Sequence, residues 1–158
     1  MRLAELISDK DIYPESHKQF KFKNKWDVIS SCTQIALDSK GLPHLFEHAK
    51  EILFERERSM STGIGEGVAI PHATSDQITE TLVAFFTFPT GIEFESVDGK
   101  PIYIVVLMLV PKNQLQKQIL ALSAIARMGM NSKLKEEIVS SKDSGVIWSL
   151  IHDSETSK

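Results

Sequence analysis

The sequence predicts an α/β fold with a covered central sheet, because two strand-like runs lie between helical segments. Residues 82–88 and 102–110 have the length and apolar composition of strands. The second run is apolar at nearly every position, which is typical of an interior strand covered on both faces. Segments with helical spacing of apolar residues precede and follow the two runs, so helices are available to cover the sheet.

Two helices are predicted before the strands, at about residues 26–40 and 43–58, from the spacing of their apolar residues. Gly41 suits the position that follows a helix, and Pro43 suits a first helical turn. A short helical turn is also expected at residues 3–7.

The segment between that turn and the first long helix, residues 10–25, is predicted to be extended. Lysines and phenylalanines are interleaved in it, as in an edge strand with one solvated face. The residues of this pattern are Lys18, Phe20, Lys21, Phe22, Lys23 and Lys25.

Three helices are predicted after Pro111, over residues 115–126, 134–139 and 143–151. The polar residues 152–158 are expected to fray. No linker or repeat divides the chain, so residues 1–158 are expected to form a single domain. In the first of the three helices, one apolar face is expected to consist of Leu115, Ile119, Leu122 and Ala126.

Composition excludes several classes of function. A net charge of −3 without a basic face argues against nucleic-acid binding. The apolar runs are too short to cross a bilayer as a helix, and the N-terminus lacks a signal-peptide pattern, so we expect a cytoplasmic protein without membrane insertion. The one cysteine, Cys32, lies in an apolar helical pattern and is expected to be a buried small residue.

The segment from Arg56 to Ala73, RERSMSTGIGEGVAIPHA, combines four features suited to holding a phosphoryl group. Three alternating glycines, from Gly63 to Gly67, predict a loop whose backbone N–H groups can approach an anion. Hydroxyl side chains stand before this loop, and an arginine lies upstream near the predicted end of a helix. His72 ends the predicted strand 68–72, where Pro71 restricts the backbone.

Nucleotide-binding motifs do not fit this segment. The dinucleotide fingerprint and the kinase glycine loop both require a glycine where Val68 stands. The Walker loop requires Gly-Lys-Ser/Thr, but Glu66 follows Gly65 and Val68 follows Gly67. A protein phosphohistidine is therefore a more natural phosphoryl source than a nucleotide.

Imidazole is suited to carrying a phosphoryl group. Neutral histidine is nucleophilic near neutral pH, and the N–P bond that it forms is labile enough to pass the group onward. Arg56 is predicted to donate a fork of N–H bonds to the phosphoryl oxygens. Thr62 is predicted to add a hydroxyl hydrogen bond, with Ser61 and Gly63 beside it.

These motifs resemble the fructose–mannitol type of IIA domain of the bacterial sugar phosphotransferase system, including its nitrogen-regulatory branch. The resemblance rests on Arg56-Glu57, on residues 61–65 and on residues 67–73, and it extends over nearly the whole chain. It implies a mixed sheet with helices on both faces. It also implies that His72 accepts a phosphoryl group from the carrier HPr or its nitrogen-branch counterpart, and that Arg56 stabilises the group.

Two residues depart from the family pattern. Family members often have a second histidine at the start of the helix after Pro111, where this chain has Gln118. Glutamine can donate a hydrogen bond to a phosphoryl group but cannot supply a charge. Glu66 adds a negative charge near the expected site, which would oppose phosphorylation if the side chain pointed there.

Three functions remain open at this stage. The first is a phosphoryl carrier of nitrogen-regulatory type, which the absence of any fused membrane or sugar-binding segment favours. The second is a regulatory interaction module that binds a partner and transfers few phosphoryl groups. The third is a IIA component for uptake of fructose- or mannitol-type sugars that delivers the group to a IIB component.

No cofactor and no metal are expected. His44 and His48 have a spacing that can bind a metal from a helix, but no third ligand with suitable spacing accompanies them. A solvated helix face is the favoured interpretation of this pair.

Overall fold

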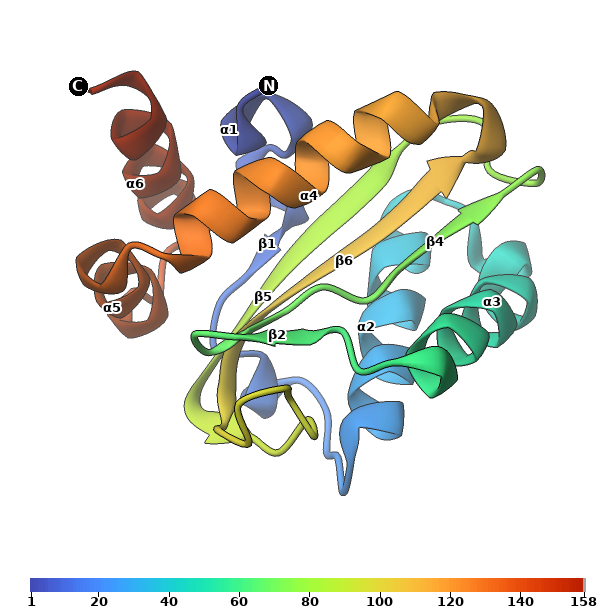
Figure 1. Cartoon of the computed structure of the whole chain (residues 1–158), viewed down its shortest axis with the longest axis horizontal. Coiled ribbons are helices and arrows are strands. Elements are labelled where there is room, and N and C mark those ends of the chain that lie inside the picture. Colours follow the sequence, from blue (N-terminus) through green and yellow to red (C-terminus); the bar gives the residue numbers. More distant parts are fainter. Residues whose placement is uncertain (158) are drawn as a thin grey trace.

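The computed structural model describes residues 1–157 and contains one mixed sheet with helices on both faces, as the sequence and the family resemblance imply (Figure 1). The strand order is β1-β5-β6-β3-β2, and β4 pairs with β6 beyond the end of β3. The strands are β1 (Ile12–Tyr13), β2 (Gly63–Gly65), β3 (Val68–Ala69), β4 (His72–Ser75), β5 (Leu82–Ile92) and β6 (Ile102–Pro111).

The two long strands β5 and β6 are antiparallel and form the centre of the sheet. β3 and β4 run parallel to β6 and follow one another along its other edge. Parallel pairing requires a crossover connection, which β5 provides between β4 and β6 because it lies on the other side of β6. β4 therefore lies directly beside an interior strand, which fixes its first residue in place.

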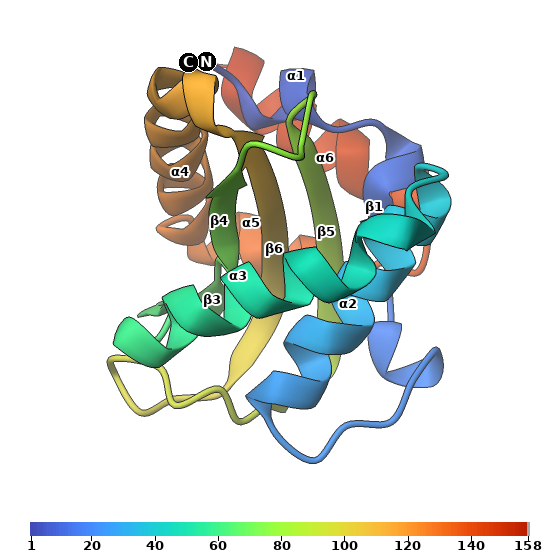
Figure 2. The ribbon, with the colours of Figure 1, turned by 90° about the vertical axis from the view of Figure 1, so that its right-hand side faces the viewer.

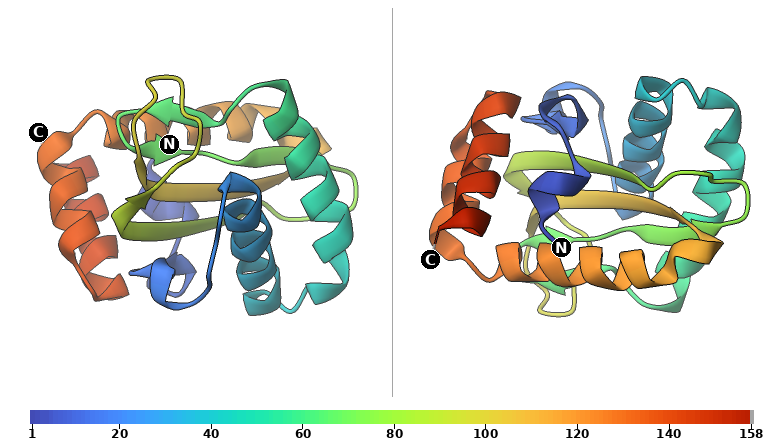
Figure 3. Two further views of the ribbon diagram at one scale, coloured as in Figure 1. Left: turned by 90° about the horizontal axis from the view of Figure 1, so that it is seen from below. Right: turned by 90° about the horizontal axis from the view of Figure 1, so that it is seen from above.

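Helices cover the two faces of the sheet (Figures 2 and 3). α2 and α3 pack on one face, while α1, α4, α5 and α6 pack on the other. The helices are α1 (Leu3–Leu6), α2 (Lys25–Ser39), α3 (Phe46–Ser59), α4 (Leu115–Gly129), α5 (Ser132–Ser140) and α6 (Ser144–Thr156). None of the helices within residues 1–157 has the length and apolarity to cross a membrane.

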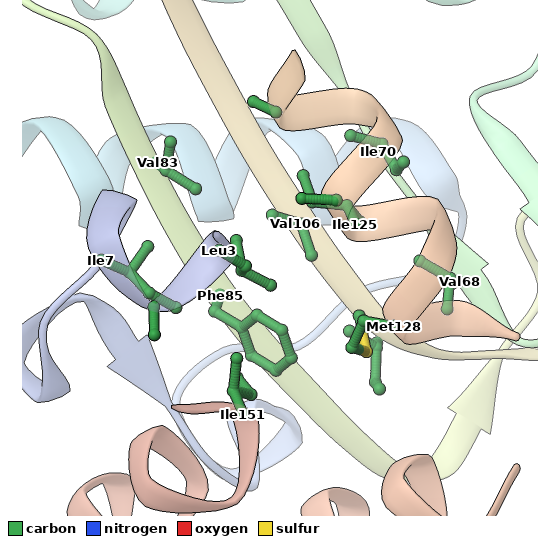
Figure 4. Close-up of a cluster of buried hydrophobic side chains, with 14 of the residues drawn as sticks. Leu3, Ile7, Val68, Ile70, Val83, Phe85, Val106, Ile125, Met128 and Ile151 are labelled. Carbon is green, nitrogen blue, oxygen red and sulfur yellow. The ribbon is translucent and has the colours of Figure 1, made fainter. Parts of the chain in front are cut away.

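Side chains of β6 alternate between two buried clusters, one on each face. Ile104, Val106 and Met108 join the cluster under α1, α4 and α6, part of which appears in Figure 4. Val105 and Leu107 join the cluster under α2 and α3. The prediction of an interior strand covered on both faces is confirmed.

The predicted edge strand at the interleaved lysines is wrong. A 3₁₀ turn (Ser16–Lys18) and an irregular segment replace it, and Lys25 begins α2. Phe20 and Phe22 pack edge-on against Phe88 of β5, with ring centroids 6.0 and 5.7 Å away. The aromatic pair is therefore explained by packing against the sheet rather than by pairing with it.

The predicted apolar face of α4 is also wrong in part. Leu115 and Ile119 are both 56% exposed, whereas Ala121, Ile125 and Met128 are buried. The helix carries two apolar stripes, and spacing alone does not tell which one faces the sheet.

The C-terminal segment does not fray at His152 as predicted, because α6 continues to Thr156. The carboxylate of Glu155 accepts hydrogen bonds from the backbone N–H groups of Leu3 and Ala4, at 2.6 and 2.9 Å. These bonds fasten the end of α6 to the start of α1. Residue 158 of the predicted tail lies outside the described residues.

Candidate functional site

The segment that carries the predicted site is a tight hairpin followed by a strand, not an open loop. β2 and β3 pair antiparallel, and the turn between them has positive φ at Gly65, Glu66 and Gly67 (92°, 57° and 77°). Glycine adopts this region without strain, which accounts for two of the three alternating glycines. His72 begins β4 rather than ending the preceding strand, because Pro71 separates β3 from β4.

His72 is half-buried and pairs with Met108 of β6 in the parallel register. Its Nδ1 atom lies 2.7 Å from the carbonyl oxygen of Ile70. A carbonyl oxygen only accepts hydrogen bonds, so Nδ1 carries the proton and Nε2 keeps its lone pair. The sequence left the tautomer open, and this geometry selects the one with a nucleophilic Nε2.

Burial lowers the pKa of His72, and the positive charge of Arg56 lowers it further. The hydrogen bond to Ile70 and the charge of Glu57 act in the opposite direction but do not cancel the decrease. The ring is therefore neutral near pH 7, which is the protonation state that a nucleophile requires.

Arg56 lies in the last turn of α3, and its Nη1 donates to the carbonyl oxygen of Met60 at 2.8 Å. Within residues 1–157 this is the only side-chain hydrogen bond of Arg56. A guanidinium has five N–H donors in a planar fork, so donors remain for an anion. The positive charge of Arg56 also lowers the pKa of His72, so it favours the neutral imidazole.

Thr62 lies below the surface, with 2% of its area exposed. Its hydroxyl donates to Glu57 Oε1, and its backbone N–H donates to Glu57 Oε2 at 2.9 Å. The hydroxyl that was predicted to contact a phosphoryl group therefore already has a partner inside the protein.

Ser61 and Gly63 are also engaged within the protein. The hydroxyl of Ser61 donates to the carbonyl oxygen of Phe94 at 3.3 Å and accepts from the N–H of Gly63 at 3.1 Å. A Cβ atom on Gly63 would lie 2.6 Å from Cβ of Ser96, so this position needs glycine for close packing. The Ser61 hydroxyl and the Gly63 N–H, which were predicted to lie beside the phosphoryl group, therefore already have partners inside the protein.

Glu57 is buried in the last turn of α3, although a glutamate near a helix end is ordinarily exposed. It is 2% exposed and binds Thr62 through both carboxylate oxygens, while Lys25 Nζ lies 3.2 Å from Oε2. A signal for its burial exists in the sequence. Glu57 continues the four-residue spacing of Ala49 and Leu53, both of which are buried.

Gln118 lies in the first half of α4 and is half-buried. Its Oε1 atom is buried and has no hydrogen-bond partner among the residues that the structure describes. No hydrogen bond joins Gln118 to His72 in that same part of the chain. One polar atom of Gln118, the residue that departs from the expected family pattern, is therefore buried without a partner among the described residues.

Glu66 is paired on the far side of the hairpin. Lys135 of α5 donates to the carbonyl oxygen of Glu66, and Lys135 Nζ lies 3.9 Å from its carboxylate. Both residues border a cavity of about 640 Å³ that is also lined by Tyr103 and Val139. None of the predicted site residues lines this cavity, so the carboxylate of Glu66 belongs to a different part of the surface from the imidazole.

The second histidine of the pair, His48, forms a hydrogen bond with Ser75. Its Nε2 lies 2.6 Å from the hydroxyl oxygen of Ser75 at the end of β4. The contact joins α3 to β4, and His44 lies outside it in the preceding 3₁₀ turn.

Several relatives match most of this chain, and two of them illustrate the range. A fructose-specific EIIABC component from Bacillus subtilis is 28% identical over 152 residues, which are 96% of this chain but 23% of that protein. A nitrogen regulatory protein homolog from Haemophilus influenzae is 27% identical over 168 aligned positions, which cover all of this chain and 95% of that protein. The chain thus spans about a quarter of the first relative and nearly all of the second.

Solved structures have the same fold. The nitrogen regulatory protein IIA-Ntr from Neisseria meningitidis matches 94% of this chain and 98% of its own, with a TM-score of 0.82 and 23% identity. Enzyme IIA mannitol from Escherichia coli, in a complex with phosphorylated enzyme IIB mannitol, matches 92% of this chain and 96% of its own, with a TM-score of 0.76 and 17% identity.

The family assignment rests on a model of the whole family rather than on any single relative. The family model for the EIIA 2 component of the phosphoenolpyruvate-dependent sugar phosphotransferase system matches residues 15–154. That range includes both long strands and the whole segment from Arg56 to Ala73, so the resemblance inferred from the motifs is confirmed. This chain belongs to the EIIA 2 family of the phosphoenolpyruvate-dependent sugar phosphotransferase system.

Proposed function

We propose that this chain is a phosphohistidine carrier, in which His72 Nε2 takes a phosphoryl group from a phosphorylated carrier protein and gives it to a second protein. The observation that carries the proposal is the hydrogen bond from His72 Nδ1 to the carbonyl oxygen of Ile70. This bond leaves Nε2 unprotonated, and the lowered pKa keeps the ring neutral.

The transfer is a direct exchange of one N–P bond for another. The lone pair of His72 Nε2 forms a bond to phosphorus while the N–P bond of the donor phosphohistidine breaks, and the donor nitrogen keeps that electron pair. The proton on Nδ1 stays in place and donates to Ile70 throughout. Arg56 neutralises the phosphoryl oxygens as charge shifts between the two nitrogens.

The donor in this proposal is HPr or its nitrogen-branch counterpart. Histidine-to-histidine transfer requires two proteins to touch around the reacting atoms. Met60 and Ile64, which flank Thr62 in the chain, are 65% and 43% exposed. Apolar side chains exposed on the segment that carries the predicted site support docking of a protein rather than a small substrate.

The onward role that we favour is nitrogen regulation, in which a regulatory protein is the partner. The full-length match to a nitrogen regulatory protein homolog supports this choice. The match to a fructose-specific component supports the alternative, transfer to a IIB component for sugar uptake. Incubation of the phosphorylated chain with a IIB domain separates the two roles, because only the uptake role requires transfer of the phosphoryl group to IIB.

A second candidate is a regulatory interaction module that binds a partner and transfers few phosphoryl groups. Gln118 favours it, because an uncharged side chain stands where relatives often place a histidine and its Oε1 has no partner among residues 1–157. An imidazolium could neutralise a phosphoryl group, whereas an amide donates only a neutral hydrogen bond.

One experiment distinguishes the carrier from the module. The protein is incubated with phosphoenolpyruvate, the first enzyme of the phosphotransferase chain and either HPr or its nitrogen-branch counterpart, and its intact mass is measured at neutral pH. The carrier gains one phosphoryl group. His72→Ala prevents the gain, while His44→Ala, at an exposed position, does not. Absence of any gain with both donors would support the interaction module.

A further inference from the structure

A continuous path of hydrogen bonds leads from Lys25, at the start of α2, to the imidazole of His72. Lys25 Nζ lies 3.2 Å from Glu57, and Glu57 accepts from the hydroxyl and the backbone N–H of Thr62. The carbonyl oxygen of Thr62 accepts from the N–H of Ile70 at 2.9 Å, and the carbonyl oxygen of Ile70 accepts from His72 Nδ1. Each bond fixes the group that makes the next one.

The two charged residues of this path are almost fully enclosed. The side chains of Lys25 and Glu57 are 7% and 1% exposed. Charged groups are rarely buried to this extent, because each loses its hydration. Every oxygen of the Glu57 carboxylate has at least one donor, so the pair is well satisfied.

Glu57 follows Arg56 directly in the chain, and its negative charge raises the pKa of His72. A negative charge here would repel an incoming phosphoryl group, which carries negative oxygens itself. The positive charge of Lys25 offsets it over a short distance. The other charge near Lys25 is the carboxylate of Glu95, at 3.6 Å, which is 67% exposed and therefore largely screened by water.

We propose that Lys25 and Glu57 are positioning residues for phosphorylation of His72. Glu57 holds Thr62, and through it Ile70, so that the imidazole presents Nε2, and Lys25 cancels the charge that this arrangement places beside the phosphoryl site. The proposal rests on the carrier function proposed above. It assigns a positioning role to a lysine that forms no hydrogen bond with His72 among the described residues.

Charge-specific variants separate this role from a structural one. Lys25→Met leaves the carboxylate uncompensated, so the pKa of His72 rises and phosphorylation slows by roughly tenfold. Glu57→Gln keeps an acceptor for Thr62 but removes the negative charge, so the pKa of His72 falls. In Lys25→Met/Glu57→Gln the two effects cancel, and both the pKa and the rate return toward those of the unaltered protein.

The pKa of His72 is measured by NMR titration of the ring signals in the unphosphorylated protein, and the rate by mass spectrometry with a phosphorylated carrier. Lys18→Met is the matched control, because it removes one lysine charge from a side chain that is 61% exposed. In this variant, neither the pKa of His72 nor the rate of phosphorylation changes.

Opposite pKa shifts in the two single variants, with recovery in the double variant, support the proposal. Shifts in the same direction, or none in a folded Lys25→Met protein, overturn it. If Lys25→Met does not fold, Glu57→Gln and the double variant still decide, since a purely structural network predicts loss of rate in both. If the unaltered protein accepts no phosphoryl group, the carrier function fails while the pKa measurements still test the charge pairing.

Discussion

His72 and Ile70 are joined by a hydrogen bond of 2.7 Å between the ring Nδ1 and the backbone carbonyl oxygen two residues earlier. The bond fixes both the orientation of the ring and the nitrogen that carries the proton. Pro71 lies between the two residues and restricts the backbone that connects them. The consequences of this arrangement for reactivity can be measured.

The pKa of His72 lies below the ordinary histidine value of 6.5, mainly because of burial. Protonation blocks the nucleophile, so the rate of phosphorylation should fall only at a pH below that value and should be constant above it. Arg56→Ala should raise the pKa and move the decline toward neutral pH. Rates measured across a pH series, alongside an NMR titration of the ring, test this, and a decline centred above 6.5 in the unaltered protein contradicts it.

Removal of the Arg56 guanidinium should slow phosphorylation by about 10²-fold, because a preorganised donor to the phosphoryl oxygens is lost. Arg56→Lys should recover only part of the rate, since an ammonium cannot provide the planar fork. Arg58→Ala is the matched control, because Arg58 lies two residues away and is exposed. Equal rates for Arg56→Ala and Arg58→Ala would exclude a role for Arg56 in transfer.

Thr62→Val should reduce stability more than it reduces the rate of transfer. The hydroxyl satisfies the buried carboxylate of Glu57, and its loss should cost about 1–3 kcal/mol in the free energy of unfolding. Thr62→Ser retains the hydroxyl and should lose less. Urea unfolding measures the stability, and a large loss of rate at unchanged stability would instead favour the direct phosphate contact predicted from the sequence.

Glu155→Ala should destabilise the protein by about 1 kcal/mol, because it removes the acceptor for two N–H groups at the start of α1. Phosphorylation of His72 should be unaffected. Glu137→Ala, at an exposed position of α5, serves as the control. Amide hydrogen exchange should be faster in α1 of the variant than in α1 of the unaltered protein. Equal exchange rates of α1 in the two proteins would contradict the prediction.

The sequence predicted the elements whose patterns have one interpretation. The uniformly apolar run in β6 and the spacing in α2 gave the correct element type, since each pattern fits only one packing environment. The face of α4 was not predictable, because Leu115 and Ile119 form a second apolar stripe beside the buried one. That choice depends on tertiary contacts that local spacing does not encode.

Within the site, the roles of His72 and Arg56 were predicted from residue chemistry and remain predictions for experiment. The position of the Thr62 hydroxyl was not predictable, because it depends on the burial of Glu57. A glutamate between two arginines at a helix end is ordinarily solvated. Its burial requires a lysine from a different helix, and the pairing of Lys25 with Glu57 spans 32 positions of sequence.

The alternation of β6 side chains between two clusters has a consequence for how the protein unfolds. If the helices on one face of the sheet were lost, the β6 side chains on that face would be exposed, while its other side chains would still pack in the opposite cluster. The two layers therefore share one central element and should melt in a single cooperative transition rather than one after the other. β4, which begins with His72, pairs with β6 and is therefore held by the element that both layers share.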